Sequence, residues 1–164
     1  MANDIKMTLG ASIILNKVLN AILFVDQSTT PAKERPLSLP IKYKLQRAKS
    51  LVEKDCAFFD TERDNLIKEM GVEKGDHSAI YVPEDKLDEY KKRLTELVQL
   101  EISHDFLKIK PEDVANIDVE GLTTEEVALF MAYLIDDEDL IKDLSTPIEK
   151  PVKEEEKPAE EEEK

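Results

Sequence analysis

The chain has 164 residues, of which 41% are hydrophobic, 5% aromatic and 37% charged, and its net charge at pH 7 is −14. Because the phosphates of nucleic acids and the headgroups of anionic membranes repel so acidic a protein, the charge argues against direct binding to nucleic acid and to membranes. The single cysteine, Cys56, excludes an intramolecular disulfide and favours a reducing compartment.

The first predicted helix begins after Thr8, whose hydroxyl can cap free backbone N–H groups. Apolar residues recur with helical spacing through residues 9–25 and cover so much of the helix that other parts of the protein, or a partner, must bury it. Polar residues interrupt this stretch and no basic segment precedes it, so we expect neither a secretion signal nor a membrane span. Residues 27–31, Gln-Ser-Thr-Thr-Pro, should end the helix.

A second, long helix is predicted over residues 40–70, with Pro40 near its first turn. Apolar residues recur every seven positions at Leu45, Val52, Phe59 and Leu66. The intervening positions include Asp55 and Glu62, which a plain two-stranded coiled coil would not tolerate, so this stripe predicts packing inside one domain. Gly71 should stop the helix at its C′ position.

Residues 79–82 are typical of a short strand, and residues 83–85, Pro-Glu-Asp, predict the start of a third helix. The inner face of that helix comprises Leu87, Tyr90, Leu94, Leu97 and Val98. Residues 100–109 alternate with a period of two, which predicts a strand with a bulge near Phe106. Because a lone strand leaves its backbone unsatisfied, we expect this strand to pair with residues 79–82.

Pro111 opens a predicted short helical turn, and Thr123 and Glu126 have the spacing of a capping box before a fourth helix. Residues 140–144 fit a last helical turn. From residue 147 the chain is rich in Glu, Lys and Pro, which predicts a disordered acidic tail over 147–164 and a single, mainly helical domain over 1–146.

The expected fold is α+β, mainly α. The second and third helices should form an antiparallel hairpin, against which the first and fourth helices pack, and the two strands should form a small two-stranded antiparallel ribbon.

The residue types that usually carry chemistry are sparse in this sequence. The two histidines, His77 and His104, lack the spacing of zinc ligands, and Cys56 has no second cysteine to join it. We interpret His77 as a solvated loop residue, His104 as a half-buried and hydrogen-bonded strand residue, and Cys56 as a core residue whose pKa burial raises. We therefore predict no catalytic residue, no metal ligand and no cofactor.

One acidic run stands out just after the fourth helix: Asp136, Asp137, Glu138 and Asp139. Carboxylates bind Ca²⁺ or Mg²⁺, but the run lacks the ligand spacing of an EF-hand loop. We interpret it as a solvated helix end and retain its four residues as candidates for interaction with a partner.

The order of several segments resembles a known group of proteins. These segments are Leu39-Pro40-Ile41-Lys42-Tyr43-Lys44-Leu45, Glu69-Met70-Gly71, the helix from Leu87-Asp88-Glu89-Tyr90 to Leu97, Glu101-Ile102-Ser103 and Gly121-Leu122-Thr123. Together, over about residues 9–135, they resemble a family of small uncharacterised proteins encoded by tailed phages of Gram-positive bacteria and their prophages. The resemblance implies a phage or prophage setting and synthesis in the cytoplasm of a bacterial host, with no activity and no functional residue attached.

These observations predict a non-catalytic phage structural or assembly protein that acts through protein–protein contacts, either with its own copies or with virion components. The alternative is an acidic inhibitor or adaptor that binds a basic host protein, including at a nucleic-acid-binding surface. The alternative rests on charge, because the first 148 residues alone retain ten net negative charges. Salt-tolerant self-association would favour the structural protein, and salt-sensitive binding the inhibitor.

Overall fold

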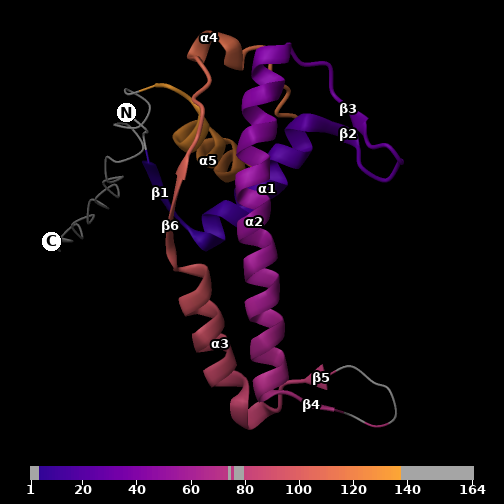
Figure 1. The fold of residues 1–164 in the computed structure, drawn as a ribbon, viewed down its shortest axis with the longest axis vertical. Helices are drawn as coiled ribbons and strands as arrows, with labels where there is room; N and C mark the ends of the chain where they lie inside the picture. The colour runs from indigo at the N-terminus through magenta and orange to yellow at the C-terminus, as the bar shows by residue number, and fades with distance from the viewer. Residues whose placement is uncertain (1–3, 74, 76–79, 138–164) are drawn as a thin grey trace, which may run out of the picture.

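The computed structural model describes residues 4–73, 75 and 80–137, which form an α+β fold dominated by helices, as the sequence predicts (Figure 1). In chain order the elements are β1 (Asp4–Thr8), α1 (Leu9–Leu23), β2 (Phe24–Asp26), β3 (Lys33–Glu34), α2 (Leu39–Met70), β4 (Val72–Glu73), β5 (Ile80–Tyr81), α3 (Glu84–Val98), β6 (Glu101–Asp105), α4 (Pro111–Val114) and α5 (Thr124–Leu134). Predictions for His77, Glu138, Asp139, the turn at 140–144 and the tail at 147–164 lie outside the described residues.

Helix α1 begins where the sequence predicts. The Thr8 hydroxyl accepts a hydrogen bond from the backbone N–H of Ala11 at 3.1 Å, which satisfies one of the free donors of the first turn. The predicted end is wrong, because the helix stops at Leu23 and residues 24–26 pair with 33–34 as the antiparallel ribbon β2–β3. Val25 therefore lies on a strand and is half exposed, instead of extending the apolar helix face.

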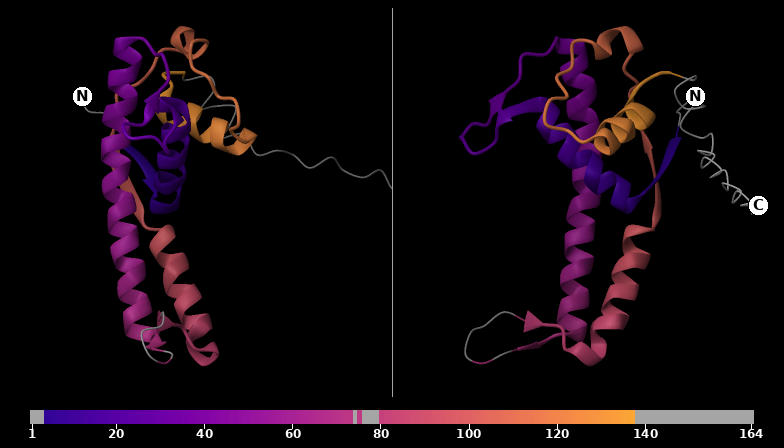
Figure 2. Two further views of the ribbon diagram at one scale, coloured as in Figure 1. Left: turned by 90° about the vertical axis from the view of Figure 1, so that its right-hand side faces the viewer. Right: turned by 180° about the vertical axis from the view of Figure 1, so that it is seen from behind.

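Helix α2 forms the long axis of the molecule, and its two halves have different surroundings (Figures 1 and 2). Leu45, Ala48 and Val52 in the first half are fully buried, and α1 crosses α2 there. In the second half only Leu66 and Met70 are buried. The heptad pattern thus predicts the helix correctly, but only part of its stripe reaches the core.

Gly71 ends α2 as predicted, but not through the left-handed conformation that glycine usually supplies at a helix end. Its φ is −82°, which any residue can adopt. A Cβ added here would overlap Cγ2 of Ile80 and the carbonyl oxygen of Ile67. Glycine is therefore required for space, because β5 folds back against the end of the helix.

The predicted pairing of the strands is wrong. β6 pairs antiparallel with β1, in a register that sets Met7 opposite Ile102 and Ile5 opposite His104. β5 pairs instead with β4, so residues 72–81 form their own hairpin. The ladder between β1 and β6 runs without a shift from Glu101 to Asp105, and β6 ends before Phe106, where the bulge was predicted.

Helix α5 closes the core from the other side of α1. Thr123 and Glu126 form the predicted capping box, in which the Thr123 hydroxyl accepts from the backbone N–H of Glu126 at 3.2 Å and the Glu126 carboxylate accepts from that of Thr123 at 3.0 Å. Phe130, on the inner face of α5, is fully buried. The predicted turn at Pro111 is confirmed as α4.

The elements fall into two regions. The body consists of β1, α1, β2, β3, the first part of α2, β6, α4 and α5, which surround one hydrophobic cluster. The arm consists of residues 58–70 of α2 together with β4, β5 and α3, and it projects from the body as the predicted antiparallel helical hairpin (Figures 1 and 2). At the junction Leu9 donates a backbone hydrogen bond to Leu100 at 2.8 Å.

Candidate functional site

The acidic run after α5 does not form a cation site in the part that the structure describes. Asp136 is exposed, and its backbone N–H donates to the carbonyl of Ile109 at 2.8 Å. Its charge acts on Lys108, whose pKa burial lowers while Asp136 opposes the shift. Among residues 4–73, 75 and 80–137, no group of three or more His, Cys, Asp or Glu side chains is placed to hold a metal ion.

The most polar cluster of the body joins three elements. The hydroxyl of Ser12 on α1 donates to Oδ2 of Asp55 on α2, and Nε2 of His104 on β6 lies 2.6 Å from the same oxygen. A carboxylate can only accept, so Nε2 carries the hydrogen of that bond. Ser12 is fully buried, and the side chains of His104 and Asp55 are 12% and 15% exposed. The prediction that His104 is half-buried and hydrogen-bonded is confirmed.

This cluster contains the residue types of a hydrolase triad, but their order of contact differs. A serine nucleophile needs histidine between it and the aspartate, so that the imidazole can take the hydroxyl proton. Here Asp55 is central, and both Ser12 and His104 donate to it. The cluster therefore acts as a polar clamp that fixes α1, α2 and β6 to one another at the base of the arm.

An open cleft of about 610 Å³ lies in the angle between α1 and the middle of α2. Cys56 lines this cleft and is only partly buried, so the prediction that it packs in the core is wrong. Burial does raise the pKa of its thiol, as expected, while a hydrogen bond with Asn16 opposes the shift. The Oδ1 atom of Asn16 is buried with no hydrogen-bond partner among the described residues.

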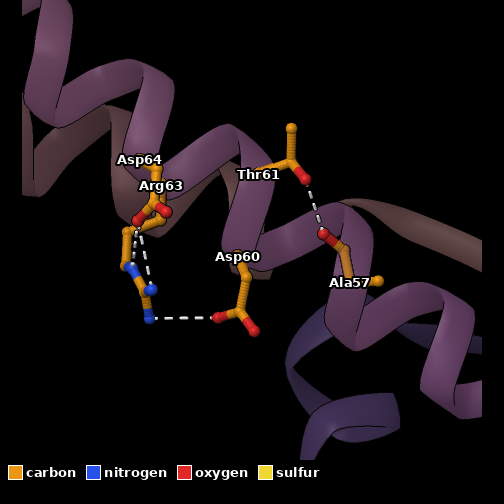
Figure 3. Close-up of polar contacts among 5 residues, drawn as sticks. All are labelled: Ala57, Asp60, Thr61, Arg63 and Asp64. Carbon is orange, nitrogen blue, oxygen red and sulfur yellow. Dashed lines mark hydrogen bonds and ion pairs between the residues drawn. The ribbon is translucent and has the colours of Figure 1, made fainter.

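Both cations of the cleft are already paired with carboxylates. Figure 3 shows the Arg63 guanidinium between two aspartates of its own helix, with contacts of 3.1 Å to Asp60 and 3.2 Å to Asp64. Lys17, on α1, lies 2.6 Å from Glu126. The cleft thus offers amide groups and an apolar floor, but neither cation is available to hold an anion without breaking an ion pair.

Helix α3 has an apolar face that the rest of the fold does not bury. Its sequence is strongly amphipathic, yet none of its residues is buried. The five side chains of its predicted inner face remain partly exposed: Leu87, Tyr90, Leu94, Leu97 and Val98. Each helix of a pair covers only one side of the other. The apolar contact between α2 and α3, here called the apolar seam, therefore stays open to solvent along its flanks.

Further apolar residues of the arm and its base are exposed. Phe58 on α2 is 46% exposed, Leu100 at the base of α3 is 45% exposed, and Val72 and Ile80 at the tip are also exposed. Contiguous exposed apolar surface marks interaction sites. The body also exposes apolar residues, Ile14, Val25, Leu39 and Tyr43, but none of these lies on a helix that lacks buried residues altogether. One ion pair, between Arg93 and Glu69 at 2.8 Å, joins α3 to α2 across the seam.

Sequence reasoning missed the clamp of Ser12, Asp55 and His104, although its signal was present. Each of the three is a polar residue on the core-facing side of its own helix or strand, where the pattern would otherwise place an apolar residue. Asp55 was noted only as an interruption of the α2 stripe. Three such interruptions on different elements point to one shared polar network, because buried polar groups require partners.

No protein-family model, no curated protein and no solved structure matches this chain. Within the described ranges, none of the helices combines the length and the apolar composition that a membrane crossing requires.

Proposed function

We propose that the protein is a non-catalytic structural or assembly component that acts through protein–protein contacts made by its arm, in the phage or prophage setting that the sequence resemblance implies. The main support is the exposure of α3, which is an amphipathic helix of 15 residues without a single buried side chain. Such a helix gains most of its stability from packing, so its apolar face calls for a partner.

Two features of the body support a role in binding rather than in a reaction. The serine and histidine of the polar clamp are both engaged by Asp55, so the imidazole is not in contact with the Ser12 hydroxyl as it is in a hydrolase triad. The body is closed around its own core, whereas the arm stands away from it (Figure 2). The arm is thus presented as a projecting element, which is the geometry of a docking module.

Photocrosslinking in the producing cell tests this proposal. A photoreactive amino acid replaces Tyr90 on α3, and the matched control replaces Tyr43, which is 58% exposed at the far end of α2. Irradiation should join the Tyr90 variant to a protein, either another copy or a different one, and should give much less product with the Tyr43 variant. Equal amounts of crosslinked product from both positions, or no crosslinked product from position 90, would contradict the proposal.

The second candidate is the acidic inhibitor or adaptor that binds a basic protein, and it is favoured by the net charge of −14. A complex held by charge should weaken steeply between about 0.05 and 0.5 M salt, because the Debye length falls below the spacing of exposed charges. A complex held by the apolar seam of the arm should persist. The salt dependence of the crosslinking yield, with salt added before irradiation, therefore separates the two candidates.

A further inference from the structure

We draw no further inference here: the strongest candidate, the apolar seam between α2 and α3 in the arm, is the surface on which the proposed function already rests, and nothing among the residues that the structure describes shows what covers it.

Discussion

The body and the arm use the same kinds of apolar residue with different results. In the body, α1 contacts α2, α5 and β1, and residues such as Leu19, Val52 and Phe130 are fully buried. In the arm, only Leu66 and Met70 are buried among the residues that the structure describes. An amphipathic sequence alone therefore does not make a core, because enough neighbouring elements must also be present to close it.

The difference in packing should have its largest effect on stability when one leucine of each region is replaced by alanine. Leu19→Ala in the body should lower the free energy of unfolding by about 3–5 kcal/mol, because it leaves a cavity among fully buried side chains. Leu94→Ala in the arm should cost only about 1 kcal/mol in dilute solution, since that side chain is still partly in contact with water. Denaturant unfolding of both variants measures the gap, and equal losses would contradict the distinction.

The polar clamp should be the next most sensitive feature, because it connects the body to the base of the arm. Asp55→Ala leaves Ser12 and His104 without their shared acceptor, and we expect a loss of about 2–4 kcal/mol. The control is Asp64→Ala, an exposed carboxylate on the same helix, which should change stability by about 0.5 kcal/mol or less. If the two variants unfold at the same denaturant concentration, the clamp has no structural role.

A smaller effect is expected where α5 begins. Thr123→Ala removes the side-chain half of the capping box and should cost about 1 kcal/mol. Thr124→Ala, one residue further along, serves as the control and should stay within about 0.5 kcal/mol of the unmodified chain. Thermal unfolding of the two variants side by side measures the difference, and the cap is refuted as a stabilising contact if Thr124→Ala is the more harmful change.

The smallest predicted effect is one of pH dependence. The Lys17 ammonium, followed by the backbone N–H of Thr123, lowers the pKa of Glu126 from its usual 4.5. A lowered pKa in the folded state means that this carboxylate stabilises the fold above pH 4.5, and that the stabilisation is lost as the pH falls through the folded-state value.

Glu126→Gln keeps an acceptor for the cap but removes the charge. The stability difference between the unmodified chain and this variant should therefore be constant above pH 4.5 and should shrink at lower pH. Unfolding curves at a series of pH values measure this difference. A difference that is still unchanged at about pH 3 would show that the charge contributes nothing.

Much of the fold could be predicted from the sequence, because local signals determine it. The starts of α1, α2, α3 and α5 follow from a capping threonine, a proline or an acidic first turn, and each lies within a residue of its predicted position. The alternation in β6 likewise predicted a strand. These features depend on neighbours in the chain, which a single sequence displays.

Features that depend on distant residues were the ones that failed. The partner of β6 is β1, which is distant in sequence: the side-chain ion pair between the two strands joins Lys6 to Glu101, ninety-five residues away. The five residues of β1 give too short a pattern to recognise. The partial burial of Cys56 also depends on the angle at which α1 crosses α2. For the candidate site, the sequence marked the apolar face of α3 but could not show that this face stays partly exposed after α2 and α1 have packed against it.

Helix α3 lacks the cover that the helices of the body have. Hydrogen–deuterium exchange of the full chain measures this difference residue by residue. We predict that the amides of α3 exchange much faster than those of α1, because local opening of α3 exposes little buried apolar surface. Equal protection of α3 and α1 would show that the arm is packed as well as the body.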